Sequence, residues 1–259
     1  MLTRDDLLAA LAAIHESASV RADEVTGSTN ETAAAMAEAG TPAWSLVAAA
    51  HQTAGRGRLD RRWVDVPGRA VLLSVVLRPE VAPNRVGLLA LAGGAAMARA
   101  IRSTTGRQVA CKWPNDLLLD GRKVGGVLAT SRIHGGRVVW VVIGVGVNVD
   151  APPGIEGAGA LGEVDPRALV VAFVTELHRI VEATEVPLDA RVRSAWLPVA
   201  STIGELVEAT TTDGAVVVGR AVAVDGFGGL VLSTDHGERT VAFGDVRHLR
   251  AVARPERGR

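Results

Sequence analysis

The residue types best suited to chemistry gather in one short segment, residues 112–126. Its sequence is Lys-Trp-Pro-Asn-Asp-Leu-Leu-Leu-Asp-Gly-Arg-Lys-Val-Gly-Gly, and it holds both lysines of a chain that has 28 lysines and arginines in total. An arginine would serve equally well as a surface charge, whereas a lysine delivers a compact ammonium to a single oxygen and shifts its pKa more readily. The two lysines, next to Asn115 and Asp116, therefore indicate a polar site that handles phosphate or carboxylate groups.

A β-hairpin is the structure that this segment predicts. Pro114 lacks an amide hydrogen and keeps its neighbour extended, so the preceding strand ends there. Asp-Gly at 120–121 is a strong signal for a two-residue turn, and the return strand would bring Lys123 beside Asp116, where each charge favours the other. The Gly-Gly pair at 125–126 lets a ligand approach the backbone closely. A surface hairpin with a solvated salt bridge is the alternative interpretation.

A second polar segment, residues 51–63, has the sequence His-Gln-Thr-Ala-Gly-Arg-Gly-Arg-Leu-Asp-Arg-Arg-Trp. Its glycines free the backbone and its arginine forks suit phosphate oxygens, so it predicts a phosphate-binding loop. Trp63 is suited to stack on a flat ring or on an arginine. Nucleic acid is a competing ligand for such a loop, but the loop is short and isolated in a neutral chain. Its spacing matches neither the phosphate loop of kinases nor the dinucleotide fingerprint.

Two further stretches place polar groups where a ligand would meet the backbone. Residues 28–30, Ser-Thr-Asn, precede a predicted helix, and a helix N-terminus with adjacent polar side chains binds a carbonyl or an anion. Taken alone, an ordinary N-cap is the commoner explanation. Residues 144–148, Gly-Val-Gly-Val-Asn, leave one face of a strand bare for a ligand. Asn148 either satisfies a buried backbone group or contacts the ligand.

Composition bounds the remaining possibilities. The 259 residues suggest one or two domains, and the balance of 28 acidic against 28 basic residues argues against bulk binding to nucleic acid or to a membrane surface. The single cysteine, Cys111, excludes an intrachain disulfide and a cysteine metal cluster. No two of the six histidines have metal-ligand spacing, and no nucleophile elbow is present. The N-terminus has no secretory pattern and no apolar run is expected to be long enough to cross a bilayer, which predicts the cytoplasm.

The elements that must position these residues follow from periodicity. Thr3 caps a first helix that carries Leu7, Leu8, Leu11 and Ile14 on one face, and a polar stretch follows it. Further helices are predicted at 31–39, 84–104, from 165 onward and at 187–196, and strands at 44–50, 71–77, 117–119, 124–133 and 137–149. Short alternating segments over 203–250 predict a small five-stranded barrel of SH3 type.

The expected fold class is α+β, with a mixed β-sheet and packed helices followed by the small barrel. The expected domains are a catalytic domain over 1–200 and the barrel over 201–252, with a disordered tail over 253–259.

Four blocks in this order, together with the barrel, resemble bacterial biotin protein ligases, which biotinylate acyl-CoA carboxylases. The blocks are residues 28–30, 52–63, 112–126 and 144–148, and the resemblance covers about residues 20–250. It implies a class II synthetase-like catalytic domain of the biotin/lipoate ligase type. It also implies two chemical steps, which use biotin and ATP as substrates with Mg²⁺. The carboxylate of biotin attacks the α-phosphate of ATP, giving biotinyl-5′-AMP, and a lysine of the biotin carboxyl carrier domain then displaces AMP.

The resemblance also implies roles for individual residues. Those implied in catalysis are Arg56, Asp116 and Lys123. Those implied in biotin binding are Ser28, Thr29, Asn30, Gln52, Gly55, Arg56, Gly57, Arg58, Lys123, Gly126 and Gly144. Those implied in ATP binding are Arg58, Arg61, Trp63, Asn115, Lys123 and Asn148. No side-chain cluster for direct metal binding is expected, and residues 56–68 are expected to stay mobile until ligand arrives.

Some members of the family carry an N-terminal winged helix-turn-helix and double as repressors. Only about 27 residues precede the Ser-Thr-Asn block, so we expect a monofunctional ligase that binds no DNA, acting as a monomer or weak homodimer. Leu59 and Asp60 replace a glycine-containing continuation seen in some members, which affects expectations for loop dynamics rather than for activity. A lipoate-type ligase and a non-catalytic biotin sensor are the alternative functions.

Overall fold

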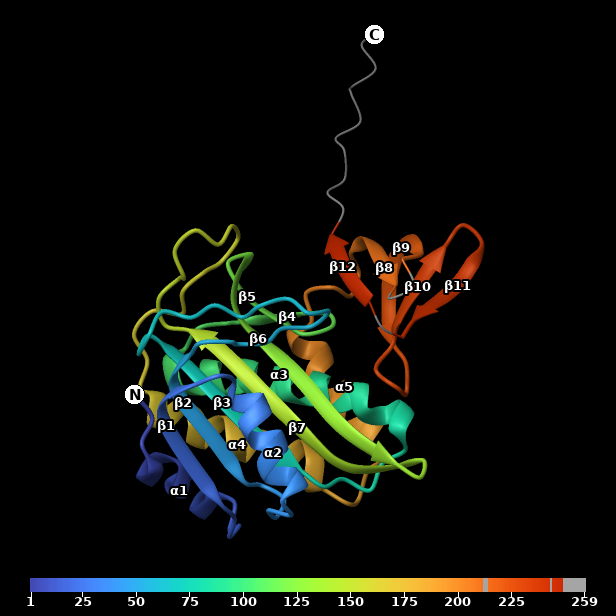
Figure 1. Ribbon diagram of the computed structural model, residues 1–259. Coiled ribbons are helices and arrows are strands. Elements are labelled where there is room, and N and C mark those ends of the chain that lie inside the picture. The colour runs from blue at the N-terminus through green and yellow to red at the C-terminus, as the bar shows by residue number, and fades with distance from the viewer. Residues whose placement is uncertain (212–213, 243, 249–259) are drawn as a thin grey trace.

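A seven-stranded mixed sheet forms the centre of the larger part of the molecule (Figure 1). The computed structural model describes residues 1–211, 214–242 and 244–248. The strands are β1 (Val20–Thr26), β2 (Leu46–Gln52), β3 (Ala70–Leu77), β4 (Ala110–Lys112), β5 (Asp116–Leu119), β6 (Arg122–His134) and β7 (Arg137–Asn148), in the order β1-β2-β3-β7-β6-β5-β4. Only the β1–β2 pair is parallel. The expected mixed sheet is confirmed.

Helices cover both faces of this sheet. The helices are α1 (Arg4–Ala13), α2 (Thr29–Glu38), α3 (Val86–Thr105), α4 (Pro166–Glu182) and α5 (Leu188–Trp196), with short 3₁₀ turns η1 (Pro83–Arg85) and η2 (Leu197–Val199). One face packs on α3, against which α4 and α5 lie, while α2 packs alone on the other face. Because the central strands are covered on both sides, they read as continuous apolar runs rather than as alternating ones.

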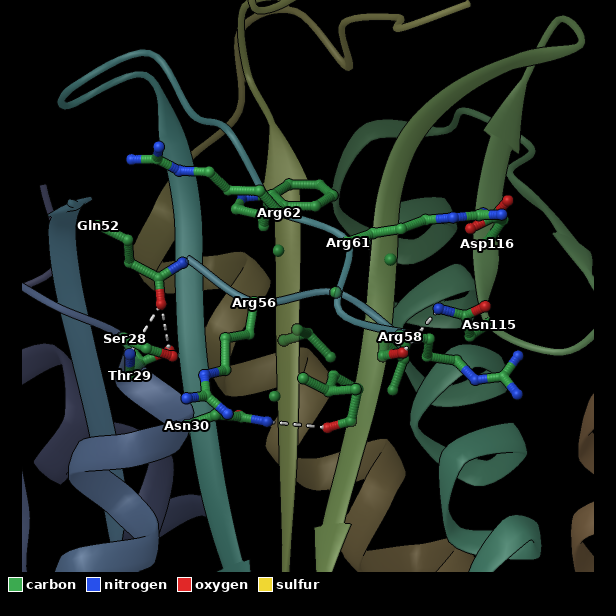
Figure 2. A pocket seen from close by; sticks show the side chains of 18 of the residues that line it. Ser28, Thr29, Asn30, Gln52, Arg56, Arg58, Arg61, Arg62, Asn115 and Asp116 are labelled. Carbon is green, nitrogen blue, oxygen red and sulfur yellow. Dashed lines mark hydrogen bonds between the residues drawn. The ribbon is translucent and has the colours of Figure 1, made fainter. Parts of the chain in front are cut away.

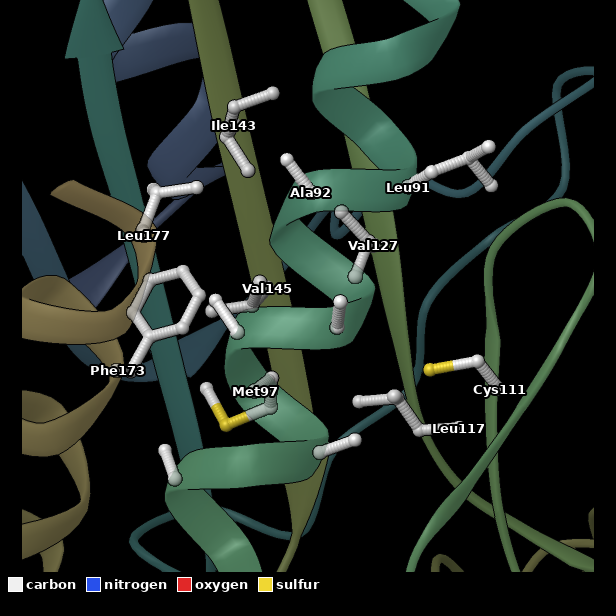
Figure 3. Close-up of a cluster of buried hydrophobic side chains, with 14 of the residues drawn as sticks. Leu91, Ala92, Met97, Cys111, Leu117, Val127, Ile143, Val145, Phe173 and Leu177 are labelled. Atoms are coloured by element: carbon white, nitrogen blue, oxygen red, sulfur yellow. The ribbon is translucent and has the colours of Figure 1, made fainter. Parts of the chain in front are cut away.

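The main core lies between α3 and the sheet (Figure 3). Gly93 of α3 faces the sheet so closely that a Cβ atom there would lie 2.9 Å from Cγ2 of Ile143 and 3.0 Å from Cγ1 of Val127. A glycine at this position therefore allows the helix to pack closely against the sheet. By length and composition alone, Pro83–Thr105 could cross a membrane, so the expectation of no such run was wrong. Its apolar stretch is 67% buried inside the fold, as in a core helix.

The sequence patterns located most elements, with three corrections. The polar stretch after the first helix contains β1, a strand at the edge of the sheet whose residues are at most partly buried, so no apolar run marks it. Leu8 does not join the buried face of α1, because it is 37% exposed whereas Leu7 and Leu11 are buried. The second helix begins at Thr29, two residues earlier than expected.

The C-terminal part is a five-stranded antiparallel sheet, as expected for an SH3-like domain. Its strands are β8 (Leu206–Thr211), β9 (Val216–Val224), β10 (Leu230–Thr234), β11 (Gly237–Val241) and β12 (Gly244–His248), in the order β11-β10-β9-β8-β12. The Trp113 indole joins it to the larger part of the molecule by donating a hydrogen bond to the Gly228 carbonyl at 3.0 Å. The domain boundaries at 200 and 252 stay predictions, and the tail predicted at 253–259 lies outside the described residues.

Candidate active site

One hollow with about 740 Å³ of empty space lies over the middle of the sheet (Figure 2). It lies between the start of α2, strands β5 to β7 and the loop of residues 53–63, which we call the arginine-rich loop. Fourteen of the residues expected at the site line it: Ser28, Thr29, Asn30, Gln52, Arg56, Gly57, Arg58, Arg61, Trp63, Asn115, Asp116, Lys123, Gly126 and Gly144. Six others also line it: Arg62, Val127, Leu128, Val145, Gly146 and Asp245. Two expected residues, Gly55 and Asn148, lie outside this lining.

The floor of the hollow is a buried network at the start of α2. Ser28 occupies the N-cap position, but its hydroxyl makes no capping hydrogen bond, so an ordinary N-cap does not explain it. The Thr29 amide donates to Gln52 Oε1 at 2.7 Å. Ser28 and Thr29 are 2% and 4% exposed. A short stretch of buried donors and acceptors such as this can orient a small polar ring.

The glycines of β7 make room for two protein side chains. A Cβ atom on Gly144 would lie 1.9 Å from Asn30 Oδ1, and one on Gly146 would lie 2.7 Å from the Trp63 ring. The bare strand face that the sequence predicted therefore exists, and Asn30 and Trp63 lie against it. Trp63 is thereby fixed at the boundary of the hollow.

The arginine-rich loop folds back on itself. Trp63 donates its amide hydrogen to the Gly55 carbonyl at 2.9 Å, and Gly57 donates to Arg61 at 2.6 Å. Gly55 acts through this fold, since a Cβ atom there would meet the Trp63 carbonyl at 2.7 Å. At the tip, Leu59 and Asp60 have φ values of +52° and +56°, a region that residues other than glycine adopt at a cost.

Carboxylates partner the arginines of the loop. Arg56 pairs with Glu31 at 2.5 Å, and Arg61 pairs with Asp245 of β12. Arg58 donates to the Gly244 carbonyl at 3.0 Å, and burial lowers its pKa, opposed by the nearby Asp245 and Asp116. The loop thus brings positive charge to the hollow, and the barrel supplies part of the wall.

Lys123 and Asp116 meet as the hairpin predicted, with Nζ 2.5 Å from Oδ1. The turn has the two positive φ values, +50° at Asp120 and +75° at Gly121, that a tight hairpin requires. The pairing register then shifts after Leu117, because β6 carries one extra residue there. The turn pairs Lys123 with Leu118, which lies on the same face of β5 as Asp116, so the hairpin itself directs the lysine into the site. The extra residue, Val124, changes the pairing beyond Lys123 and sets Gly126 opposite Asp116.

A second hollow adjoins the first, since Trp63, Asp116 and Lys123 line both. Asn148 lies here, where its Nδ2 donates to the Gly159 carbonyl at 3.2 Å. Its Oδ1 atom is buried without a partner, and so is Nε1 of Trp63. Such orphaned polar atoms are uncommon in folded proteins and are expected where a ligand completes the hydrogen bonding. The acceptor Asn148 Oδ1 and the donor Trp63 Nε1 thus lack hydrogen-bond partners on the side of the site expected to hold the nucleotide.

Sequence reasoning missed two buried polar residues behind the lining. Asp65 is 7% exposed, and its carboxylate accepts hydrogen bonds from His51 Nδ1 at 2.8 Å and the Gln52 amide at 3.2 Å. Ser74 is fully buried below Thr29 and Asn30. Ser74 was detectable, because it is a lone polar residue in an apolar strand, the signal that singled out Asn148. Within the described part of the chain, no group of three or more His, Cys, Asp or Glu residues is placed to hold a metal ion.

Comparisons with known proteins agree with this geometry. The model of the biotin/lipoate A/B protein ligase family matches residues 23–148, and that of the biotin protein ligase C-terminal domain matches residues 202–249. The biotin–[acetyl-CoA-carboxylase] ligase of Mycobacterium tuberculosis is 36% identical over 246 residues, covering 87% of each chain. The bifunctional ligase/repressor BirA of Bacillus subtilis is 31% identical over 238 residues, covering 86% of this chain and 72% of its own.

A solved structure shares the fold. The Aquifex aeolicus biotin protein ligase in complex with biotin and ATP has a TM-score of 0.70 and 22% identity, covering 89% of this chain and 99% of its own. Fold and site together define a ligase of the biotin/lipoate type. More particularly, the chain belongs to the biotin protein ligase family, as the four sequence blocks indicated.

Proposed function

We propose that this chain activates biotin with ATP to biotinyl-5′-AMP and transfers biotin to a lysine of the biotin carboxyl carrier domain of an acyl-CoA carboxylase. One observation carries the proposal. A buried hydrogen-bonding floor at Thr29 and Gln52 opens, within a single hollow, onto Lys123 and the arginines of the loop. The floor suits an uncharged polar ring, while the cations suit the carboxylate and the phosphates that must react.

The electrostatics of the first step call for these cations. The carboxylate of biotin and the α-phosphate of ATP are both anionic, so they repel each other as they approach. Arg56 and Lys123 would neutralise the two partners and hold them in line for attack. Arg58 and Arg61 would hold the remaining phosphate oxygens in their planar forks. Asn148 Oδ1 and Trp63 Nε1, both unpartnered, would face the nucleotide.

Mg²⁺ is part of the proposal through ATP. This cation commonly binds to one or two carboxylates and to phosphate oxygens rather than to a dedicated protein cage. Asp116 is a carboxylate that faces both hollows, so the lining fits this mode of binding. When bound, Mg²⁺ would offset the negative charge of the phosphates. In the second step, Asp116 would also orient Lys123 and the incoming lysine amine.

We further propose a cytoplasmic enzyme, active as a monomer or weak homodimer, with no role on DNA or at a membrane. The formal net charge of zero supports the absence of a role on DNA or at a membrane surface, as does the burial of helix α3 in the core.

Biotin-dependent exchange of labelled pyrophosphate into ATP tests the proposal without knowledge of the acceptor. Purified protein with Mg²⁺ should catalyse exchange with biotin and not with lipoate. Exchange with lipoate alone would indicate a lipoate-type ligase. A folded protein that binds biotin but exchanges with neither compound would be a sensor, and the proposed activity would be wrong.

A further inference from the structure

Lys112 is one of the two lysines of the chain, and the proposed function gives it no role. It ends strand β4 at the edge of the seven-stranded sheet (Figure 1), and it pairs with Asp116 of β5 in the antiparallel ladder. Residues paired in a ladder have their side chains on the same face of the sheet. Both residues line the second hollow, together with Trp63 and Asn148. Lys112 therefore faces the hollow proposed to hold the nucleotide.

The ammonium of Lys112 is free to bind an anion. The other lysine and arginines that line the second hollow each have a protein partner, and they are Arg62, Lys123 and Arg247. Within the part of the chain that the structure describes, the Lys112 side chain has neither an ion pair nor a hydrogen-bond acceptor.

The charged neighbours of Lys112 leave its positive charge available. Glu156 and Glu205 also line the second hollow, and neither forms an ion pair with Lys112. His248 of the barrel lies nearby, and burial, followed by the charge of Lys112, lowers the pKa of His248. The histidine is therefore neutral at pH 7 and neither offsets nor replaces the charge of Lys112.

The order of the strands places Lys112 across the site from the floor of the first hollow. Strands β7, β6, β5 and β4 follow one another in the sheet. Gly144 of β7 lies under Asn30 of the floor. Lys123 and Asp116 lie on β6 and β5, and Lys112 lies on β4. A line from the floor to Lys112 therefore passes the Lys123–Asp116 pair.

The first chemical step needs an anion site at the far end of such a line. A carboxylate oxygen of biotin forms a bond to the α-phosphorus, while the bond from this phosphorus to the oxygen that bridges to the β-phosphate breaks. Pyrophosphate leaves with the electron pair. The entering and leaving oxygens lie roughly in line. Because the carboxylate comes from the side of the floor and reacts beside Lys123, pyrophosphate leaves toward β4.

We propose that Lys112 binds the pyrophosphate leaving group, and hence the β- and γ-phosphates of ATP before the reaction. A lysine suits this task, because its compact ammonium contacts a single oxygen without imposing the planar geometry of a guanidinium. Lys112 would thus add a point charge from the sheet to the arginine forks of the loop. The inference rests on the proposed function and deepens it, because it assigns a residue to the leaving group.

The test runs the first step in reverse. Purified protein loaded with biotinyl-5′-AMP is mixed with pyrophosphate and Mg²⁺, and ATP formation in a single turnover is measured over a range of pyrophosphate concentrations. Lys112→Ala should raise the concentration that gives half the maximal rate by about 10- to 100-fold, as expected when a hydrogen bond to a charged group is lost. The Kd for biotinyl-5′-AMP, measured by calorimetry, should not change, because this compound has no β- or γ-phosphate.

Two further variants serve as controls. Lys112→Arg keeps the positive charge and should recover most of the pyrophosphate dependence, although not all of it, since the two cations differ in shape. Arg247→Ala removes another cation of the same hollow, one that pairs with Glu208 at 3.0 Å. It should leave both measurements near their wild-type values.

The outcomes separate the role of Lys112 from the activity itself. An unchanged pyrophosphate dependence in Lys112→Ala would overturn the proposal. An equal weakening of pyrophosphate and biotinyl-5′-AMP binding would also overturn it, because Lys112 would then act at the α-phosphate or in the fold. Failure of the wild-type chain to form ATP from bound biotinyl-5′-AMP would overturn the proposed function and the role of Lys112 with it.

Discussion

Asp245 of the C-terminal barrel forms an ion pair with Arg61 of the arginine-rich loop. Arg58 of the same loop donates a hydrogen bond to the neighbouring Gly244 carbonyl at 3.0 Å. Arg58 and Gly244 are 186 residues apart in the sequence, yet their segments share one wall of the hollow. The barrel is therefore part of the site, and its carboxylate faces the position proposed for the phosphates.

Asp245→Asn should lower the KM for ATP. The carboxylate competes with phosphate for Arg61 and repels the triphosphate, and exposed pairs of this kind are worth about 0–1 kcal/mol, which corresponds to at most about a fivefold change. The KM for biotin should not change. Pyrophosphate exchange over a range of ATP concentrations measures both values.

Asp235→Asn is the control for this change, because it removes an exposed carboxylate in the β10–β11 turn of the same barrel. Arg61→Ala should act in the opposite direction and raise the KM for ATP. An unchanged KM for ATP in Asp245→Asn would show that the ion pair has no bearing on the nucleotide.

Gly144→Ala should destabilise the protein. The new methyl group would lie 1.9 Å from Asn30 Oδ1, and overpacking of this kind costs about 1–3 kcal/mol. Gly126→Ala is the matched control on the adjacent strand, since its nearest neighbour would lie at 3.6 Å, an ordinary contact. Thermal unfolding should show a lower Tm for Gly144→Ala and almost none of that loss for Gly126→Ala. Equal Tm values would mean that Asn30 moves aside freely.

Local signals were sufficient for much of this site. The Asp-Gly turn placed Lys123 beside Asp116, and the separation of 2.5 Å confirms it. The helix predicted from residue 165 onward is α4, which Asp165 caps and Pro166 begins. These features depend on residues close together in sequence, whose geometry has few alternatives.

Other parts of the site depend on tertiary contacts that no local pattern encodes. Asp245 reaches the hollow only because the barrel packs beside the loop, and nothing in its own strand marks it. The bulge at Val124, which sets Gly126 opposite Asp116, is a shift of one residue in pairing, and an alternating pattern does not reveal it. Strand β1 was missed because an edge strand needs no buried apolar run.

Cys111 should be inert in the folded protein. The thiol is 2% exposed, and burial raises its pKa to about 12. At pH 8 its thiolate fraction would be on the order of a thousandfold lower than that of a free cysteine. Iodoacetamide should therefore leave the native chain unlabelled and fully active, and should label it once denaturant unfolds it. Rapid labelling of the native chain with loss of exchange would point to an accessible thiol near the site.

Lys123→Ala should reduce biotin-dependent pyrophosphate exchange by about 100- to 1,000-fold, the usual cost of losing one preorganised charge at a transition state. Its partner Asp116 remains, so a neutral ion pair is replaced by an unpaired carboxylate. The negative charge of this carboxylate opposes the approach of two anions. The fold should survive, because the Lys123 side chain is 40% exposed and partly exposed ion pairs contribute at most about 1 kcal/mol to stability.

Arg122→Ala is the matched control, because it removes the adjacent cation, which lies outside both hollows. This variant should exchange at a rate near that of the wild type. If Lys123→Ala also exchanged at that rate, the cation would have to come from the loop arginines alone, and Lys123 would be left with a structural role in the hairpin.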